Sequence, residues 1–112
     1  MNENRYNAYR IMWVMVMFDL PTDTKKERKQ AAKFRSNLLK FGFAMFQFSI
    51  YIRHCPTREH ADMQMSRLEK NLPDYGKVTM ISITDHQFGR IRTYFCKKEE
   101  QPKTGPQQLS LF

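Results

Sequence analysis

The sequence predicts an α+β fold, in which one antiparallel sheet carries two amphipathic helices on one face. Two observations predict it: apolar segments with the character of strands, and two intervening segments in which apolar residues recur at helical spacing. A chain of 112 residues has the size of one domain with one core. Its hydrophobic content of 41% and mean hydropathy of -0.67 exclude a disordered chain and an integral membrane protein.

The first strand is expected over Met12–Phe18, which is apolar at every position. A strand with one wet face would alternate polar and apolar residues, so this strand is predicted to be covered on both faces. Helices can cover only one of them. A second sheet, most simply from an identical chain, is expected on the other face. The sequence therefore predicts a homodimer through facing sheets.

Two helices are predicted from their ends and their apolar stripes. Thr24 and Glu27 have the spacing of a capping box, and Gly42 is placed to end the first helix. Pro56 with the following threonine signals the second helix, which Pro73 ends. The apolar stripes are Ala31, Phe34, Leu38 and Phe41 in the first helix and Ala61, Met65, Leu68 and Leu72 in the second.

The remaining strands complete the plan. Apolar residues of Phe43–Arg53 change parity near Met45 and Phe46, which predicts a bulge or two short strands. Further strands are expected over Val78–Thr84 and, from its alternation, over Phe88–Phe95. The resulting order is the ferredoxin-like β-α-β-β-α-β fold with an extra C-terminal strand.

The two ends of the chain differ from its centre. Residues 1–10 are polar and form a leader ahead of a domain that we expect to span residues 11–96. Residues 97–112 have the composition of a linker but close on an apolar tail. Such a tail is either a frayed terminus or an adhesive segment that adds a strand to a partner's sheet edge. Its apolar residues are Leu109, Leu111 and Phe112.

Positive charge is concentrated in the first predicted helix. The net charge of +8 suits nucleic acid, although acidic lipid or solubility alone accounts for the same composition. Glu27 is the one acidic residue among the cations of this helix, whereas an ordinary solvated helix face mixes positive and negative charges. The pattern therefore favours a phosphate-binding surface. Arg53, Arg90 and Arg92 can extend it. The helix cations are Lys25, Lys26, Arg28, Lys29, Lys33, Arg35 and Lys40.

The two cysteines, Cys55 and Cys96, are too few for a disulfide framework. Neither a secretory signal nor an apolar run of membrane-spanning length is seen, so we expect a cytoplasmic protein without a membrane partner. With His54 and His60, Cys55 offers at most three zinc ligands without the paired spacing of a zinc site, which disfavours zinc.

Asp19 ends the apolar run, where a carboxylate must reach water or a cation at the rim of the sheet. Two interpretations remain open. The carboxylate can accept amide hydrogen bonds from the following turn or cap the helix, or it can bind a divalent cation. Magnesium needs only one or two carboxylates when nucleic-acid phosphate completes its shell. One chain offers Asp19 and Asp23, and a twofold axis would bring two copies of Asp19 together.

The segment Phe41–Phe48 is similar to the aromatic strand of the RNA recognition motif, whose sheet aromatics stack on bases. The match is partial, because no basic residue precedes Gly42 and Met45 replaces an aromatic. The segment also follows the first helix directly instead of forming a central third strand. We therefore expect these aromatics in the core and keep an RNA-binding module of this kind as an alternative.

Several motifs, in their order, resemble a known family. An apolar strand ends in FDLP (residues 18–21), a basic helix follows, and QFSIYIR (residues 47–53) precedes a second amphipathic helix. Over Met12–Phe95 the chain resembles the small CRISPR-associated endoribonuclease family of the spacer-acquisition, or adaptation, machinery. The closing QLSLF (residues 108–112) is similar to the tail of the branch that accompanies type II CRISPR systems.

The resemblance implies a ferredoxin-like homodimer in which the last strand of one protomer extends the sheet of the other. It implies a scaffold that binds duplex prespacer DNA across its basic surface and bridges subunits of a CRISPR-associated integrase. It also implies that Asp19, with Asp19 of the second copy, is the magnesium ligand and catalytic residue of a nuclease. Arg53 is implied only as a contact to the nucleic-acid backbone.

Two departures from the family pattern bear on function. The leader precedes the family's usual start, and the turn after Asp19 lacks an arginine, so phosphate contact there falls to Lys25 and Lys26. Nuclease activity varies within the family and spacer acquisition does not generally require it. We therefore expect scaffolding first and magnesium-dependent cleavage, of RNA or DNA, second. A toxin-like, metal-dependent ribonuclease of the same fold, which needs no integrase, is the other alternative.

Overall fold

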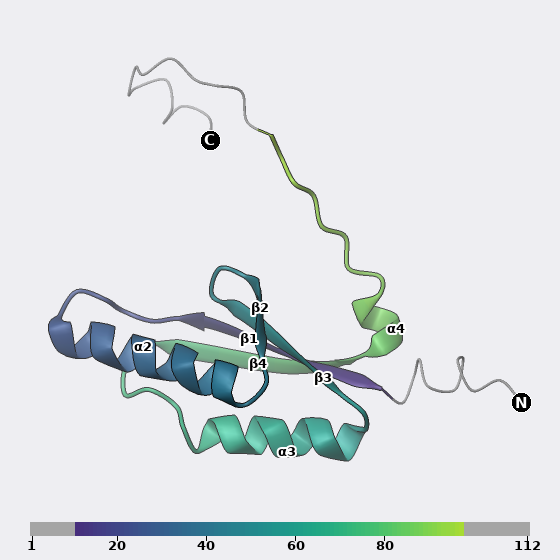
Figure 1. The fold of residues 1–112 in the computed structure, drawn as a ribbon, viewed down its shortest axis with the longest axis horizontal. Helices are drawn as coiled ribbons and strands as arrows, with labels where there is room; N and C mark the ends of the chain where they lie inside the picture. The colour runs from purple at the N-terminus through teal and green to yellow at the C-terminus, as the bar shows by residue number, and fades with distance from the viewer. Residues whose placement is uncertain (1–10, 98–112) are drawn as a thin grey trace, which may run out of the picture.

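The computed structural model describes residues 11–97, which form one four-stranded sheet and its helices (Figure 1). The strand order is β2-β3-β1-β4, and each neighbouring pair is antiparallel. This arrangement confirms the predicted α+β plan and is consistent with a ferredoxin-like fold. The elements are β1 (Met12–Asp19), α2 (Lys25–Lys40), β2 (Ala44–Gln47), β3 (Ile50–Cys55), α3 (Arg58–Glu69), β4 (Lys77–Thr84) and α4 (Asp85–Phe88).

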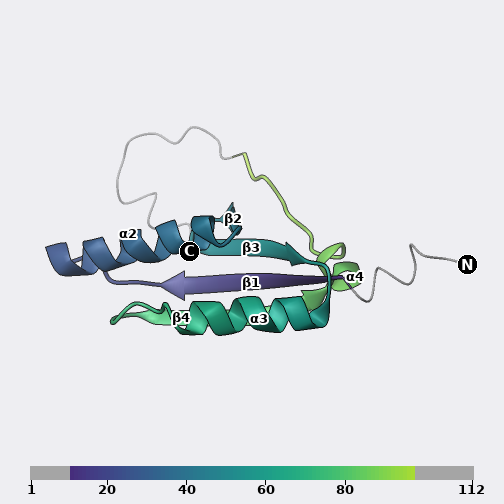
Figure 2. The same cartoon turned by 60° about the horizontal axis from the view of Figure 1, so that its bottom comes forward.

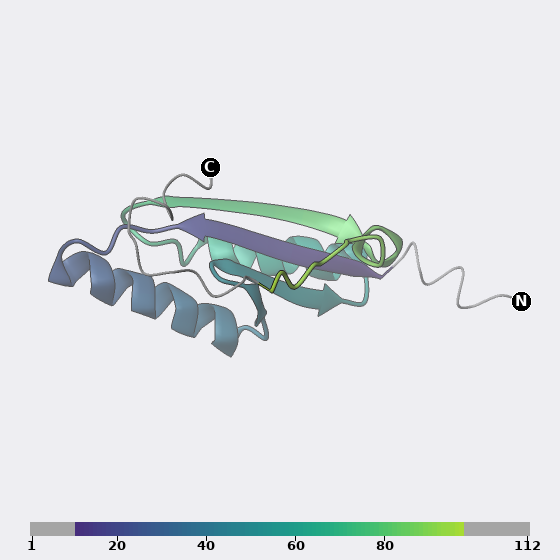
Figure 3. The same ribbon diagram turned by 90° about the horizontal axis from the view of Figure 1, so that it is seen from above.

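One face of the sheet packs against both long helices. Leu38 of α2 and Leu68 of α3 are fully buried in the same core as every second residue of β1. Figure 2 shows α3 running alongside β1, and Figure 3, seen from above, shows the strands lying over α3. Each such leucine contributes about 1.5–3 kcal/mol through burial. The buried residues of β1 are Met12, Val14, Val16 and Phe18.

Hydrogen bonds at the helix ends match the sequence signals. Thr24 Oγ1 accepts from the Glu27 amide at 3.1 Å, and Glu27 Oε1 accepts from the Thr24 amide at 3.0 Å, which confirms the capping box. Gly42 follows α2 with φ 90°, a conformation that favours glycine. The expected stripe of the second helix is too long, because α3 ends at Glu69 and Leu72 lies beyond it, 43% exposed.

The change of parity near Met45 marks a real irregularity of the sheet. The pairing of β2 with β3 shifts between Met45 and Gln47, so the segment forms two strands joined by a tight turn. Ser49 takes φ 66° in that turn. This confirms the prediction of a split strand pair, and it leaves Phe48 78% exposed at the tip.

The second face of the sheet, which we call the open face, is apolar but only partly buried. Trp13, Met15 and Met17 of β1 alternate with the buried residues and are half-buried. Ile81 of β4 lies opposite Met15 and is 46% exposed. Within residues 11–97, α4 packs on this stripe at Trp13, whereas Ile81 stays exposed. The homodimer expected there stays a prediction.

The strand expected over Phe88–Phe95 is not formed. Thr84 and Gln87 build a second capping box, which starts the short helix α4 just before the segment that the alternation had suggested as a strand. Residues 89–97 pair with no strand and run away from the sheet (Figure 1). Because strand hydrogen bonds need a neighbouring strand, an alternating pattern alone does not fix this segment within one chain.

An aromatic anchor holds α4 to the open face. The Trp13 indole Nε1 donates a hydrogen bond of 2.7 Å to Asp85 Oδ1. The Phe88 ring stacks on the Trp13 ring with centroids 3.9 Å apart and an interplanar angle of 10°. These three side chains, the α4 anchor, fix where the C-terminal segment leaves the sheet. Among the described helices, none has the length and apolar character needed to cross a bilayer.

Candidate nucleic-acid interface

The structure separates the cations of α2 into those that line a groove and those that do not. Lys26, Lys29 and Lys33, spaced three and four residues apart, share one face of α2. They line a groove of about 510 Å³ between α2 and the connection from α3 to β4. Lys70, which follows α3, lines the same groove. We call this the lysine groove.

Two side-chain hydrogen bonds join the walls of the lysine groove. Gln30 Nε2 donates to Asp74 Oδ2 at 2.7 Å, and the Asp74 amide donates to Gln30 Oε1 at 2.6 Å. Asp74 also lines the groove and is the one acidic residue among its lining residues. The brace between Gln30 and Asp74 therefore fixes the position of the connection relative to α2.

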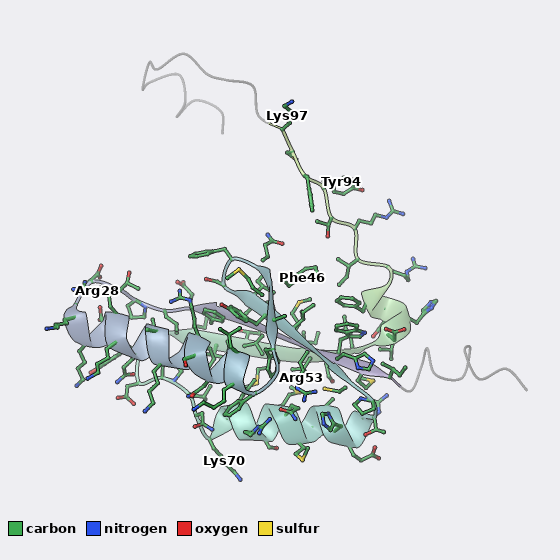
Figure 4. The ribbon with its side chains drawn as sticks, viewed as in Figure 1. Arg28, Phe46, Arg53, Lys70, Tyr94 and Lys97 are labelled. Atoms are coloured by element: carbon green, nitrogen blue, oxygen red, sulfur yellow. The ribbon has the colours of Figure 1, made fainter. Side chains whose placement is uncertain are left out.

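The arginines of α2 have other contacts. Arg28 Nη1 donates to the carbonyl oxygens of Thr22 and Asp23, at 3.1 and 3.2 Å, at the start of the helix (Figure 4). The Arg35 guanidinium lies 5.7 Å from the centroid of the Phe18 ring. Lys25 and Lys40 are exposed outside the groove. The prediction of a uniform basic helix therefore resolves into a smaller set of lysines on one face.

Arg53 ties the end of α2 to β3. Its Nε donates to the Phe41 carbonyl oxygen at 2.8 Å, and its Nη1 donates to the His54 carbonyl oxygen at 2.9 Å. A Cβ added at Gly42 would lie 2.9 Å from Arg53 Nε, so glycine makes room for this guanidinium. Figure 4 shows Arg53 in the region between α2 and α3. The side chain thus has a structural role that the sequence did not reveal.

The other predicted arginines lie away from the lysine groove. Arg90 and Arg92 are exposed in the segment that follows α4. Figure 4 shows this segment, marked by Tyr94 and Lys97, leaving the sheet on the side away from the two long helices. Within one chain these arginines do not extend the α2 surface.

Asp19 lies exposed at the end of β1, on the same alternation as the apolar residues of the open face. Lys77 is its partner in the register of β1 with β4. Gly76 takes φ 99°, and a Cβ added there would lie 2.7 Å from the Asp19 carbonyl oxygen. Backbone of the α3 to β4 connection therefore approaches the Asp19 main chain closely.

Asp19 does not belong to a cluster of metal-binding side chains among the described residues. Across residues 11–97, no three His, Cys, Asp or Glu side chains gather as a group able to hold a metal ion. A lone exposed carboxylate fits magnesium only as part of a larger oxygen shell, completed by water, phosphate or a second copy. Asp23 lies at the beginning of α2, where its amide donates to Glu27 Oε1 at 2.9 Å.

The structure also separates His54 from Cys55, two of the residues weighed as zinc ligands. His54 contacts Trp13 edge-on, with ring centroids 5.2 Å apart, whereas the neighbouring Cys55 is fully buried among the core residues. Successive strand residues point to opposite faces. Burial raises the pKa of the Cys55 thiol, and the nearby Arg53 charge and hydrogen bonding only partly oppose it. Cys55 is therefore a core residue.

The aromatic segment does not form a base-stacking surface on a central strand. Phe43 is 3% exposed in the core, and Phe41 packs against that core. Phe46 lies on the edge strand β2, with its ring centroid 6.1 Å from that of Phe88 (Figure 4). The expected core role therefore holds for Phe41 and Phe43, whereas Phe48 is exposed at the hairpin tip.

Sequence reasoning missed several residues of the site. Lys70, Gln30 and Asp74 join the groove only because the α3 to β4 connection folds back against α2. Pro73 predicted the end of the second helix but not the direction of the connection that follows it. Lys77 directly precedes the strand expected over Val78–Thr84, but its position opposite Asp19 depends on register.

Comparison with known proteins places the chain in a family. A family model described as "CRISPR associated protein Cas2" matches residues 12–91. The chain is 50% identical over 108 residues to the CRISPR-associated endoribonuclease Cas2 of Flavobacterium psychrophilum, covering 96% of this chain and 94% of that protein. It is also 50% identical over 101 residues to the protein of that name from Parvibaculum lavamentivorans, covering 90% and 100% of the two chains. The family match and these relatives show that the chain belongs to the CRISPR-associated Cas2 family.

Proposed function

We propose that this protein acts in CRISPR adaptation as a homodimeric scaffold that binds duplex DNA and bridges subunits of the CRISPR-associated integrase. Membership of the Cas2 family supports this setting. The observation that carries DNA binding is the lysine groove, in which four lysines gather around one carboxylate. Duplex DNA presents a phosphate charge about every 1.7 Å along its axis, which matches such a cluster.

The open face supports a dimer. Its apolar residues need a cover, and a second copy of the same face provides one of matching length and chemistry. The segment after α4 supports exchange between the copies, because Tyr94 and Phe95 are 73% and 81% exposed. We propose that this segment pairs with an edge of the second copy's sheet, where Arg90 and Arg92 then reach DNA.

Sedimentation tests the dimer directly. The Ile81→Glu variant places a charge on the open face and should sediment as a single copy with its circular dichroism unchanged. Leu39→Glu is the control, because Leu39 is 59% exposed on α2 and lies off that face. A wild-type chain that sediments as a single copy at every concentration contradicts the dimer.

Charge reversal in the lysine groove tests DNA binding. The variant Lys29→Glu/Lys33→Glu should lose about tenfold or more of its affinity for duplex DNA at physiological salt, because two phosphate contacts become repulsions. The control Lys40→Glu/Arg58→Glu makes the same change in net charge at exposed residues outside the groove. Fluorescence anisotropy with a labelled duplex measures both. Equal losses in the two variants would show that only overall charge matters.

The bridge to the integrase is tested by copurification. We propose that the apolar tail Leu109, Leu111 and Phe112, which lies outside the described residues and is similar to the tail of the branch accompanying type II systems, binds the integrase. Deleting residues 109–112 should then abolish copurification with the integrase while duplex binding persists. A chain that cleaves RNA and never copurifies with the integrase favours the toxin-like ribonuclease instead.

A second candidate function is magnesium-dependent phosphodiester cleavage at Asp19. The observation that favours it is the position of Asp19 at the end of the open face, where a second copy would bring another Asp19 near. The relatives' name, endoribonuclease, supports RNA as substrate. Magnesium held there would neutralise charge on the scissile phosphate. Lys77, opposite Asp19 in register, is suited to hold a neighbouring phosphate.

The conservative variant Asp19→Asn tests this candidate. It should abolish magnesium-dependent cleavage of single-stranded RNA while leaving sedimentation and duplex affinity unchanged, because Asp19 lies outside the lysine groove. Asp62→Asn, an exposed aspartate of α3, is the control. Cleavage that persists in Asp19→Asn would assign the activity to another site or to a contaminant.

A further inference from the structure

We infer that Lys70 contacts the same DNA backbone as the lysines of α2, and that Asp74 weakens this contact while bracing the groove. This inference rests on the proposed function and goes beyond it. The lysine groove combines four ammonium groups with one carboxylate. The Asp74 carboxylate is held by Gln30, so it cannot simply turn away from the groove without losing that hydrogen bond.

The dimensions of the groove suit a nucleic-acid backbone. An α-helix rises about 1.5 Å per residue, so Lys26 and Lys33 are separated by roughly 10 Å along α2. This span covers about three nucleotides of one strand, at about 3.4 Å of duplex axis each. Lys70 belongs to the other wall, at the end of α3 from which the connection starts (Figure 4). A strand that follows the groove therefore meets lysines from two elements.

The lining also favours an anionic over an apolar ligand. Besides the lysines, the side-chain amides of Asn37 and Asn71 line the groove. Asn71 Nδ2 donates one of its two hydrogens to the Arg67 carbonyl oxygen at 2.8 Å, which leaves the other N–H to donate to a phosphate oxygen, as the amide of Asn37 also can. Among the apolar lining residues, Phe34 is only 1% exposed, so the apolar surface of the groove comes from Leu72 and Pro73 on the connection after α3. Backbone phosphates carry no sequence information, so binding here is expected to be independent of DNA sequence.

Asp74 has two opposing effects on such binding. Its hydrogen bonds with Gln30 position the wall that carries Lys70, whereas its negative charge repels phosphate. Replacing Asp74 by asparagine keeps an oxygen that accepts from Gln30 Nε2 and removes the charge. One repulsion between unit charges at roughly 7 Å in water corresponds to about a threefold change in affinity. Asp74→Asn should therefore bind duplex DNA about threefold more tightly than the wild type.

Lys70→Gln should have the opposite effect and a characteristic salt dependence. Each lysine contact to a duplex phosphate contributes about 0.9 to the slope of log affinity against log salt. Between about 50 and 200 mM salt, the wild type should thus lose about 3.5-fold more affinity than Lys70→Gln. Lys40→Gln, which removes a lysine of α2 outside the groove, should leave the slope unchanged.

The experiment is a salt titration of anisotropy with one labelled duplex, in which Asp62→Asn serves as the control for Asp74→Asn. Tighter binding by Asp74→Asn together with a smaller slope for Lys70→Gln supports the inference. Variants that match their controls, while Lys29→Glu/Lys33→Glu loses binding, overturn the inference and leave the proposed function standing. A wild type without duplex affinity overturns both. Tighter binding of polyglutamate than of duplex DNA in the groove also overturns the inference.

Discussion

Arg53 offers a decisive test, because its two possible roles predict different outcomes. Sequence resemblance suggests a contact to the nucleic-acid backbone, whereas the structure engages its guanidinium with the carbonyl oxygens of Phe41 and His54. Arg53→Lys keeps the positive charge but cannot present two donors in the planar geometry of a guanidinium. Arg53→Gln removes the charge as well. The pair of variants therefore separates charge from geometry.

The expected cost follows from these hydrogen bonds. A bond from a charged donor stabilises a protein by about 1.5–3 kcal/mol. The bond to Phe41 is partly buried and the bond to His54 is exposed, so the first contributes most of the effect. We expect each variant to lower the free energy of unfolding by about 2 kcal/mol. For a domain of this size, that corresponds to a decrease in Tm of roughly 8 °C.

Calorimetry and anisotropy distinguish the two roles. If Arg53 is structural, both variants melt at lower temperature, and below the melting range their salt slopes for duplex binding equal that of the wild type. If Arg53 contacts phosphate, Arg53→Lys keeps the wild-type Tm and Arg53→Gln lowers the slope by about 0.9. That second result would refute the structural role. All samples need one protein concentration, since melting of an associating protein depends on it.

Four further predictions concern stability and accessibility. Because burial raises the pKa of the Cys55 thiol, iodoacetamide should alkylate the exposed Cys96 first and Cys55 only on unfolding, as mass spectrometry can count. Because the Cys55 thiol ionises more readily in the unfolded chain, the free energy of unfolding should be fully present below the ordinary thiol pKa of about 8.5 and should fall as pH rises above it. Urea titrations across that pH range measure this fall. Trp13→Phe should keep the stacking on α4 but lose the hydrogen bond to Asp85, at a cost of about 1–2 kcal/mol, with faster amide exchange in α4. Gly76→Ala should cost about 2 kcal/mol in urea unfolding, because its Cβ would collide with the main chain of β1 at φ 99°; an unchanged midpoint contradicts this.

Local signals predicted the local structure well. The capping box at Thr24, the glycine after α2 and the parity change at Met45 each depend on a few neighbouring residues, and each is present. The apolar run Met12–Phe18 of β1 likewise reflects one buried face and one half-buried apolar face. Each of these features depends on residues that lie close together in the sequence, within one or two helical turns or strands.

Features that depend on distant contacts were not predictable. The alternation after Phe88 looks like a strand, but within residues 11–97 no other strand pairs with this segment, and the contact of Asp85 with Trp13, 72 residues away in the sequence, sets where the segment leaves the sheet. The lysine groove likewise needs the contact of Gln30 with Asp74, 44 residues apart. Seven cations on one predicted helix looked equivalent, and only packing distinguishes Lys33 from Arg35.

The sheet divides the molecule into two sides of different chemistry. The lysine groove belongs to the helical side, and the apolar stripe with Asp19 belongs to the opposite side. Two copies joined through their stripes would carry their grooves on outward, opposed surfaces. A single straight duplex then contacts both grooves only if it crosses the edge of the dimer. If instead one duplex lies along each outer surface, the dimer binds two duplexes. The stoichiometry of DNA at saturation therefore reports the path of the nucleic acid over the assembly.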